Sequence, residues 1–391
     1  MRIAILAYNL RVAGGLVVGR NLVAQIPVLR PNHQYLIIVP KGLGYETHKD
    51  RGYVKCLEVT PMRFFKRIYF DLIKLQCIVR NFKPDIILGL GNLGLVAPPC
   101  VQAILFHKPQ LLYSSRHYAL EPINERIRDW ILERTVKRCL AGTQLVFCQT
   151  PVTKSRFAKK FGYPLEQITI LPNAVSEFVK NNVSKTEVPD VLRNSRYFDM
   201  FLLSKFYAHK NFEVLLDLYS NYGEELKDTR CIITIAPNQH TNAVKFLKEV
   251  HRRKLEDKIV NVGPLKEDEL SGYFCNCGAL LFPTLLESFS GTYLEAMHFG
   301  LPILTSDLDF AHYICGEAAL YFSPWEPADI TEKITLLKNN SFMRQDLADK
   351  GKKRLATFFR SWDSIAMDAM NAIERVAGEY RKKNFNKTPS A

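Results

Sequence analysis

Short apolar runs alternate with longer amphipathic stretches along almost the whole chain, and this alternation limits the possible folds more than any other feature. In the first half the runs are Ile3–Ala7, Tyr35–Val39, Asp85–Leu90, Val101–Phe106, Gln144–Cys148 and Ile168–Leu171. In the second half they are Phe201–Phe206, Cys231–Ala236, Ile259–Val262, Ala279–Phe282, Ile303–Thr305 and Ala319–Phe322. Strands that alternate with helices form parallel sheets of βαβ units. The pattern therefore predicts an α/β protein.

The length and a polar stretch near the middle predict two domains. A chain of 391 residues is too long for one typical hydrophobic core. The segment 176–195 is polar and has no helical or strand period, which indicates a linker. We expect an N-terminal domain over 1–174, a linker over 175–196, a C-terminal domain over 197–360, a last helix over 361–380 and a polar tail over 381–391.

The positive charge is concentrated in the first half of the chain. The net charge is +14, and residues 1–170 hold 25 Lys and Arg against 10 Asp and Glu, whereas the remainder holds 28 against 29. A basic domain beside a neutral one indicates an anionic partner for the basic domain: a membrane leaflet, a lipid phosphate, an acidic glycan or nucleic acid. No apolar run reaches the ~18 residues of a membrane span. We expect a cytoplasmic protein whose nine cysteines are reduced.

The basic and aromatic stretch 61–83 has a helical pattern and two possible interpretations. In the first it is an interfacial helix whose basic residues meet lipid headgroups while aromatic residues enter the membrane interface. The basic residues would be Arg63, Lys66, Arg67 and Lys74, and the aromatic ones Phe64, Phe65 and Tyr69. In the second it is an ordinary helix that packs on the sheet and turns its basic face to water.

The stretch 284–300 has the pattern of a ligand site. The apolar run before it reads as a buried strand, the residues 293–299 favour a helix, and Gly300 is a good helix stop. A strand, a loop of small polar residues and a helix N-terminus together attract anions. Glu287 and Glu295 frame this loop, which suits a ligand that also offers hydroxyl groups, such as a nucleotide sugar. An ordinary βα unit with solvated glutamates is the alternative.

The spacing Glu-x7-Glu resembles the signature of the retaining GT-B glycosyltransferases of family 4. Lys205 and Lys210 resemble the two cations of that family's Gly-Arg-x4-Lys motif, although Ser204 and Lys205 replace Gly-Arg, so that charge is kept and the bidentate fork is lost. The turn at Val262 resembles the family's nucleobase turn. The resemblance implies two Rossmann-like domains that face a central cleft, with the C-terminal helix crossing back to the first domain.

The resemblance also implies a reaction and a set of site residues. The reaction would move a hexose from a nucleotide-diphosphate sugar to a hydroxyl with retention of configuration. The implied catalytic residues are Glu287, His107, Lys205 and Lys210. The implied donor-binding residues are Gly14, Gly15, Lys205, Lys210, Val262, Phe289, Ser290, Gly291, Thr292 and Glu295. Glu295 would accept from the ribose hydroxyls, and Glu287 would support the sugar, with a nucleophilic role as the alternative. His107 would contact the sugar, although a lone histidine is more often structural.

Cofactor and partners follow from the same resemblance. The lysines and the helix N-terminus supply the charge that a metal would otherwise bring, and Asp307-Leu-Asp309 follows a different strand, so we expect a metal-independent reaction. The basic first domain favours a lipid-linked or other anionic glycan acceptor, as in bacterial surface polysaccharide or lipopolysaccharide assembly, with peripheral contact at the inner face of the membrane. Alternatives are a nucleotide-sugar epimerase of the same fold, a glycan phosphorylase, and a non-catalytic nucleotide-sugar-binding partner of a membrane-bound synthesis complex. Nucleic acid is not an expected partner, because no recognition motif is present.

Overall fold

Two separate parallel sheets divide the chain into two units. The structure, a computed structural model, describes residues 1–45, 51–118, 121–176, 179 and 187–385. The first unit consists of residues 1–112, 124–173 and 360–391, and the second of residues 113–123 and 174–359. The short segment 113–123, which the sequence assigned to the N-terminal domain, therefore groups with the second unit. Much of the expected linker lies outside the described residues.

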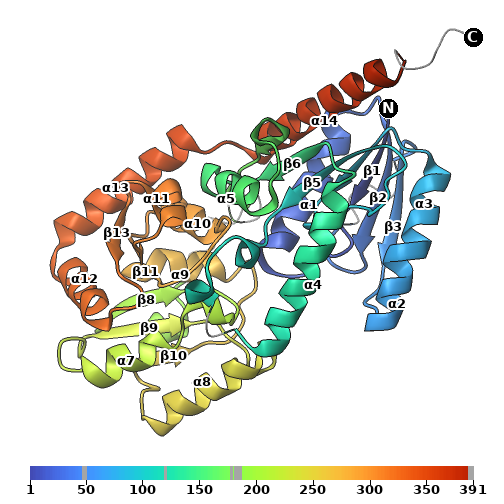
Figure 1. The fold of residues 1–391 in the computed structure, drawn as a ribbon. Helices are drawn as coiled ribbons and strands as arrows, with labels where there is room; N and C mark the ends of the chain where they lie inside the picture. The colour runs from blue at the N-terminus through green and yellow to red at the C-terminus, as the bar shows by residue number, and fades with distance from the viewer. Residues whose placement is uncertain (46–50, 119–120, 177–178, 180–186, 386–391) are drawn as a thin grey trace, which may run out of the picture. The chain divides into compact units, whose positions relative to one another are not determined.

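The first unit is built on a seven-stranded parallel sheet with the order β3-β2-β1-β4-β5-β6-β7 (Figure 1). The strands are β1 (Arg2–Leu6), β2 (Gln34–Pro40), β3 (Val54–Val59), β4 (Ile86–Gly89), β5 (Val101–Phe106), β6 (Leu145–Cys148) and β7 (Ile168–Ile170). In the centre of the sheet Ile3 pairs with Tyr35 on one side and Ile86 on the other. The α/β class expected from the sequence is confirmed.

Helices cover both faces of this sheet. They are α1 (Ala13–Leu29), α2 (Phe64–Tyr69), the π-helix η2 (Phe70–Lys74), α3 (Leu75–Phe82), α4 (Ile123–Leu140), α5 (Pro151–Phe161) and α14 (Trp362–Phe385). Helix α1 connects β1 to β2 and so leads the chain toward the β3 edge of the sheet. Helices α3, α4 and α5 connect strands in the opposite direction, toward the β7 edge. Because parallel crossovers are right-handed, α1 lies on one face and α3, α4 and α5 on the other. The last helix, α14, packs against α1.

The basic stretch 61–83 forms a continuous helix made of α2, η2 and α3. Its inner side packs on the sheet through Phe70, Leu75 and Val79, as the second interpretation expected. Arg67 pairs within the unit: its Nε donates to Asp71 at 2.7 Å and its guanidinium lies 4.6 Å over the ring of Tyr8. Arg63, Lys66 and Tyr69 are exposed, whereas nothing is described of the Phe64 and Phe65 side chains.

The second unit is built on a six-stranded parallel sheet with the order β10-β9-β8-β11-β12-β13. The strands are β8 (Phe198–Leu202), β9 (Thr229–Ile233), β10 (Ile259–Asn261), β11 (Ala279–Phe282), β12 (Ile303–Ser306) and β13 (Ala319–Phe322). The chain first adds β9 and β10 on one side of β8 and then returns to add β11, β12 and β13 on the other side. The strand order therefore reverses between β8 and β11. Loops that follow β8 and β11 are therefore neighbours at the switch point where α/β sheets bind ligands.

Seven α-helices surround this sheet in the part of the chain that the structure describes. They are α7 (Val214–Asn221), α8 (Thr241–Arg252), α9 (Leu270–Asn276), α10 (Gly291–Phe299), α11 (Asp309–Cys315), α12 (Pro327–Asn339) and α13 (Ser341–Phe358). A short 3-10 helix, η7 (Ala208–Lys210), follows β8. The core between the sheet and these helices is almost wholly aliphatic and aromatic.

Three strand predictions need correction. The strand expected at 231–236 lies at Thr229–Ile233. The strand expected at 201–206 begins at Phe198 and ends at Leu202, because Asp199, though charged, is buried in the strand and accepts from Arg230 Nε at 2.6 Å. The edge strand β3 was missed because its residues are only partly buried and alternate with polar ones. None of the described helices is both long and apolar enough to span a bilayer.

Candidate active site

The centre of the candidate site is the N-terminus of α10. Ser290 precedes the helix in an extended conformation, with φ −105° and ψ 119°, and its side chain does not cap the first N–H groups. A Cβ atom on Gly291 would meet no atom within 4 Å, so the space beside the first turn is open. Gly300 ends the helix with φ +71°, as the sequence predicted. Uncapped N–H groups at an open helix N-terminus favour an anion.

Lys210 and Glu287 form an ion pair next to this helix. The ammonium of Lys210 contacts Oε1 of Glu287, and the two side chains are only 11% and 10% exposed. Glu287 Oε1 also accepts from the Thr284 hydroxyl at 2.9 Å, and the ammonium lies 4.6 Å from the centroid of the Phe282 ring. The two residues that the sequence analysis assigned to separate tasks are thus in direct contact, and each fixes the position of the other.

Backbone contacts hold the two loops of this ion pair together. The carbonyl oxygen of His209 accepts from the N–H of Leu285 at 2.7 Å, and the Thr284 hydroxyl oxygen lies 3.3 Å from it. Lys210 is the last residue of η7, and the contact with His209 links η7 to the loop that carries Glu287. This link brings a cation from the loop after β8 and a carboxylate from the loop after β11 together at the switch point of the sheet.

Lys205 lies in the same β8 loop but has a different environment. Its side chain is exposed and forms no ion pair with any described residue. The loop around it is held by the Phe206 N–H, which donates to Gln239 Oε1 at 3.0 Å, and by the Ser204 N–H, which donates to Thr234 Oγ1 at 3.3 Å. Lys205 is thus a solvated positive charge on a fixed loop, free to approach an anion.

Glu295 has an environment that disfavours its charge. It lies in the second turn of α10 and is half-buried. Burial, with a smaller contribution from the negative charge of Glu267, raises the pKa of the Glu295 carboxyl to about 7. Near neutral pH this side chain can therefore both donate and accept hydrogen bonds, which suits it to a ligand with hydroxyl groups.

Phe289 and Val262, two further predicted residues of the second unit, make contacts within that unit. The Phe289 ring is buried and packs edge-on against Phe359 at 6.0 Å, so that only its backbone is available to a ligand. Val262 follows β10 and its N–H donates to the carbonyl of Ile233 at 3.0 Å. Gly263 then takes a left-handed conformation with φ +77°, which turns the chain sharply after the strand. Their roles in donor binding stay predictions.

The predicted residues of the first unit form a separate group. Gly14 and Gly15 are in the first turn of α1, and a Cβ on Gly15 would lie 3.8 Å from Nε2 of His107. His107 follows β5, and its N–H donates to Asn92 Oδ1 at 2.7 Å. Burial lowers the pKa of His107 to about 4, so the imidazole is neutral near pH 7. A neutral imidazole next to a helix N-terminus is suited to hydrogen bonding.

The segment 113–123 carries contacts that the sequence analysis did not anticipate. Glu121 Oε1 lies 3.1 Å from Nδ1 of His209, the residue that precedes Lys210 in the sequence. The Tyr113 hydroxyl donates to Asp309 at 2.9 Å, and the guanidinium of Arg116 lies 4.1 Å over the ring of Trp325. Glu121 and His209 are 88 positions apart, so no local pattern in the sequence could have indicated their contact.

The Asp-x-Asp stretch after β12 is occupied by other partners. Asp307 lies 2.5 Å from Nε2 of His312, and Asp309 accepts from Tyr113 and from the Phe310 N–H at 2.8 Å. Among the described residues no group of three or more His, Cys, Asp or Glu side chains is arranged to hold a metal ion. Metal independence stays a prediction.

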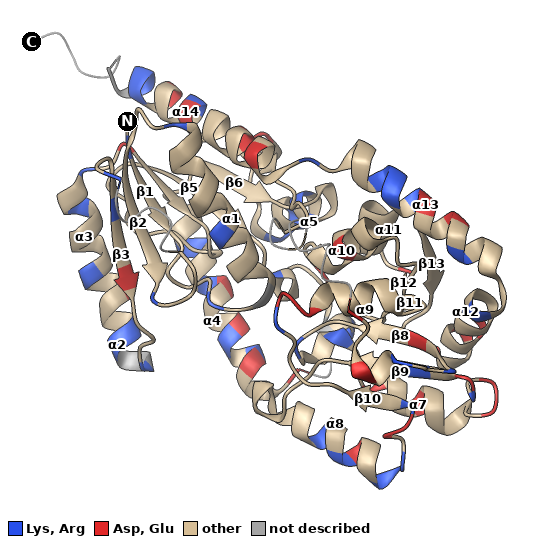
Figure 2. Cartoon of the chain, turned by 180° about the vertical axis from the view of Figure 1, so that it is seen from behind, with Lys and Arg blue, Asp and Glu red and all other residues tan. Residues whose placement is uncertain are grey.

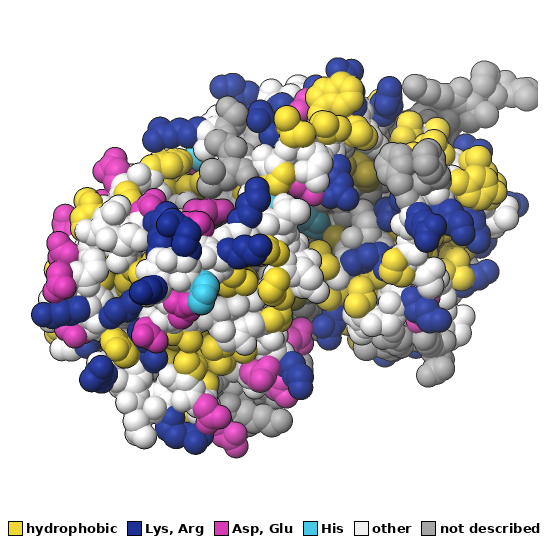
Figure 3. Space-filling model, turned by 90° about the horizontal axis from the view of Figure 1, so that it is seen from below, with side chains coloured by type: hydrophobic (Ala, Val, Ile, Leu, Met, Phe, Trp, Pro, Cys, Tyr) yellow, Lys and Arg dark blue, Asp and Glu magenta, His cyan; other side chains and the backbone are white. Residues whose placement is uncertain are grey.

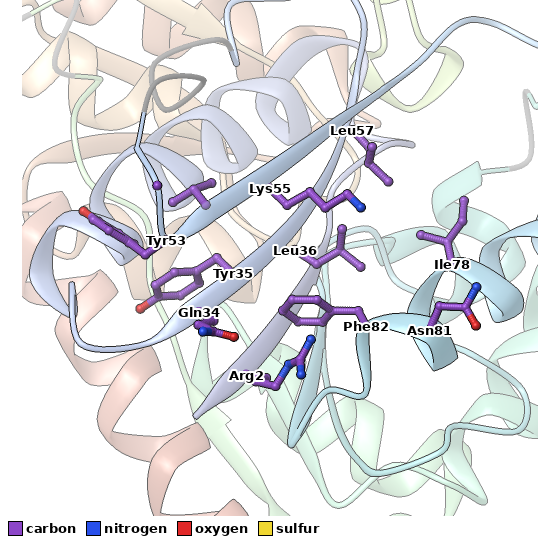
Figure 4. Close-up of a pocket in the computed structure, with 12 residues that line it drawn as sticks. Arg2, Gln34, Tyr35, Leu36, Tyr53, Lys55, Leu57, Ile78, Asn81 and Phe82 are labelled. Carbon is purple, nitrogen blue, oxygen red and sulfur yellow. The ribbon is translucent and has the colours of Figure 1, made fainter.

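A pocket of about 490 Å³ in the first unit is separate from the predicted site residues (Figure 4). It is lined by Arg2, Gln34, Tyr35, Leu36, Gly52, Tyr53, Val54, Lys55, Leu57, Ile78, Asn81 and Phe82. The guanidinium of Arg2 lies 4.7 Å from the centroid of the Phe82 ring. The pocket includes the amino ends of β1, β2 and β3, opposite to the carboxyl ends where α/β sheets bind ligands, so we do not assign it to the candidate site.

Comparisons with known proteins show which family this part of the chain resembles. Residues 183–354 match the family described as glycosyl transferases group 1. The O-antigen chain mannosyltransferase RfbU of Salmonella typhimurium is 22% identical over 195 residues, which is 50% of this chain and 50% of RfbU. The O-antigen chain mannosyltransferase B of Escherichia coli is 20% identical over 253 residues, 64% of this chain and 65% of that protein.

Solved structures resemble the whole chain rather than one half. Sucrose-phosphate synthase from Thermosynechococcus elongatus has a TM-score of 0.73 and 12% identity, with 97% of this chain and 100% of that chain covered. HepE of Anabaena, solved in complex with UDP, has a TM-score of 0.70 and 13% identity, with 96% and 100% covered. By sequence, in contrast, the matches span about half of RfbU and about two thirds of the E. coli enzyme. Residues 183–354 of this chain therefore match the group 1 glycosyltransferases, and the chain has the GT-B fold that its Glu-x7-Glu signature predicted.

Proposed function

We propose that this protein transfers a hexose from a nucleotide-diphosphate sugar to a hydroxyl of a growing or lipid-linked glycan, with retention of configuration. The observation that carries the proposal is the buried ion pair of Lys210 and Glu287 beside the open N-terminus of α10. The pair lies in the part of the chain that matches the group 1 family. A cation, free N–H groups and a carboxylate within one loop system suit a donor with both phosphates and hydroxyls.

The proposed chemistry is electrostatic. When the bond between the sugar and the diphosphate breaks, negative charge grows on the leaving phosphate oxygens. The N–H groups of the first turn of α10 and the ammonium of Lys210 are already in place to stabilise that charge, and Lys205 adds a mobile cation. Preorganised groups of this kind cost no rearrangement during the reaction. We assign to them the work that a divalent metal would otherwise do, so the proposed reaction is metal-independent.

Glu287 has two tasks in this proposal. It holds the Lys210 ammonium in one position, and its second carboxylate oxygen is available to the hydroxyls of the sugar or to positive charge at the anomeric carbon. Glu295 receives the ribose hydroxyls, since its carboxyl can accept in either protonation state. Gly14 and Gly15 keep the donor-binding role, and His107 the catalytic contact with the sugar, that the family resemblance gives them.

The similarity to O-antigen chain mannosyltransferases suggests a hexose donor of the mannose or glucose type and an acceptor in surface polysaccharide or lipopolysaccharide assembly. HepE was solved with UDP, which supports a nucleotide diphosphate as the donor's leaving group. A lipid-linked acceptor would place the protein in the cytoplasm at the inner face of the membrane. The excess of Lys and Arg in the first 170 residues supports that location, because the inner leaflet carries anionic lipids.

The test is a donor screen followed by two substitutions. Thermal shift with GDP-mannose, UDP-glucose and other nucleotide sugars identifies the donor, and its turnover is then measured with Lys210→Ala and Glu287→Ala. Each loss removes a preorganised charge, so we expect transfer to fall by about 10²–10³-fold. Lys245→Ala, an exposed lysine on α8, is the matched control and keeps wild-type turnover.

Three outcomes would contradict the proposal. Wild-type turnover in both variants would remove the ion pair from the mechanism. Full loss of transfer in EDTA, restored by a divalent metal, would contradict metal independence. An inverted anomeric configuration of the product, determined by NMR, would contradict retention.

A further inference from the structure

Helix α4 has two faces of opposite character. It is 18 residues long, yet only Val136, Cys139 and Leu140 near its end are buried, so none of its first thirteen residues has a buried side chain. An ordinary helix of a parallel α/β domain buries a continuous apolar stripe. Here the most exposed apolar residues of the helix lie on the face turned away from the sheet.

The outward face of α4 is apolar. Ile123, Ile127, Trp130 and Ile131 are 76%, 55%, 56% and 47% exposed. Their spacing of i, i+4, i+7 and i+8 places them on one side of the helix. Four large apolar side chains in one exposed row exceed the scattered single residues that are normal on a protein surface, and such a patch marks an interaction site.

Charge is distributed unevenly around the same helix. The acidic residues Glu125, Asp129 and Glu133 are half-buried, and two of them pair with the body of the unit: Asp129 with Lys108 at 2.9 Å and Glu133 with Lys160 at 3.0 Å. The basic residues of α4 are all exposed, and Arg128 pairs with Glu125 and Lys137 with Glu133, whereas Arg126, Arg134 and Arg138 have no ion pair with a described residue. The guanidinium of Arg134 lies 4.4 Å over the ring of Trp130, within the apolar row. The outward face is therefore apolar and cationic together.

A second exposed apolar group lies on the same face of the sheet. In α2 and η2, Ile68, Tyr69, Leu72 and Ile73 are exposed, with Lys66 and Lys74 beside them. The right-handed crossovers place this helix and α4 on one side of the sheet. Figure 2 shows basic residues along α2 and α3 and both basic and acidic residues along α4, and Figure 3 shows that hydrophobic and basic side chains are neighbours in several places on one face of the molecule.

We infer that α4 is the main contact of this protein with an anionic phospholipid surface, with the exposed residues of α2 and η2 as a second contact on the same face. A row of isoleucines and a tryptophan fits the boundary between headgroups and acyl chains, and arginines beside that row fit lipid phosphates. A surface that is apolar and carries cations on both sides of the apolar row matches a lipid better than an apolar protein groove. The inference deepens the proposed function, since it identifies where a lipid-linked acceptor is met.

Binding to lipid vesicles tests the inference without any transfer assay. The full chain is sedimented with vesicles of phosphatidylglycerol and phosphatidylcholine, and with phosphatidylcholine alone. We expect binding only to the anionic vesicles, and weaker binding at high salt, because the arginines act through screened charge. The double variant Ile127→Ser, Trp130→Ser should lose binding by at least about tenfold, since it removes two of the larger apolar contacts. Tyr69→Ser, Leu72→Ser should lose less.

A matched control and a spectroscopic signal keep the test specific. Phe342 on α13 is 83% exposed and belongs to the second unit, so Phe342→Ser should bind vesicles like the wild type. Trp130 is the exposed tryptophan, whereas Trp362 is buried and Trp325 half-buried. Its fluorescence should shift to the blue with anionic vesicles, and Trp130→Phe should abolish the shift.

Several results would overturn the inference. These are equal vesicle binding by wild type and the α4 double variant, or no binding by the wild type. A dimer that the α4 variant dissociates, without lipid binding, would assign the face to a second copy of the chain. The proposed transfer reaction stands or falls separately, because the turnover of a water-soluble acceptor by the α4 variant should equal that of the wild type.

Discussion

Glu295 couples the stability of the second unit to pH. Its carboxyl has a pKa of about 7 in the folded chain, above the ordinary value of a glutamate. Between these two pKa values the folded state keeps a proton that the unfolded state has lost. Stability contributed by the protonated form is therefore present at low pH and is lost as the pH rises toward 7 and above.

Replacement by glutamine removes this dependence. Glu295→Gln keeps the size and hydrogen-bonding atoms but cannot ionise, so we expect it to raise the melting temperature relative to wild type at pH 8 and to have little effect at pH 5. Thermal unfolding at both pH values measures the difference. If Glu295→Gln lowered the melting temperature equally at both pH values, the Glu295 carboxylate would be favourably solvated instead.

The segment 113–123 shows how one connecting element supports the site from a distance. It follows β5 of the first unit, and through Glu121 it holds His209, whose carbonyl fixes the loop before Glu287. We expect Glu121→Ala to loosen η7 and residues 284–287, with a cost of about 1–3 kcal/mol, because the partner of a buried imidazole nitrogen is lost. Glu121→Gln can still accept from His209 and should restore most of the stability.

Hydrogen exchange of the peptides that contain 206–211 and 284–287 measures this loosening. Glu249→Ala, which removes an exposed ion pair on α8, serves as the control and should leave both peptides protected. Unchanged exchange in Glu121→Ala would mean that the backbone bonds of His209 hold the loop without the side chain.

The same elements show what a sequence can indicate and what it cannot. The strand β11, the helix α10 and its stop at Gly300 were predicted closely because each depends on local residues: a buried apolar run, helix formers and a left-handed glycine. The edge strand β3 and the start of β8 were not, because an edge strand is half solvated and Asp199 is tolerated only by virtue of Arg230, 31 positions away. The π-helix at 70–74 has no local signal of its own that we recognised.

The candidate site was likewise predictable only in part from the sequence. The types and spacing of Lys205, Lys210, Glu287 and Glu295 were visible in the sequence, since a family signature records them. Their mutual geometry was not visible: the contact between Lys210 and Glu287, the neutral state of His107 and the support from Glu121 depend on burial and on long-range contacts. The pattern therefore indicated which residue types to expect at the site, and the fold determined which of them are in contact.

At the scale of the whole molecule, the first unit is completed by the last helix of the chain. Trp362, Ile365, Met370 and Ile373 of α14 are buried, and the helix packs on α1 and β5. Near the middle of the helix Glu374 binds Arg30 at 3.2 Å and His33 at 2.8 Å. The first unit is therefore discontinuous in sequence, whereas the second lies almost wholly within 174–359.

A chain that ends at residue 359 should consequently lose the first unit selectively. Removal of α14 uncovers the face of α1 and deletes several large side chains from the core, each of which contributes about 2–5 kcal/mol. The total exceeds the ordinary stability of a domain. We expect hydrogen exchange to show unprotected β1, β2 and β4 in the truncated chain while β8, β11 and α10 stay protected. A peptide of residues 360–391 added in trans should restore part of the protection, and an equally long scrambled peptide should not. Full protection of β1 in the truncated chain would contradict the assignment of α14 to the first unit's core.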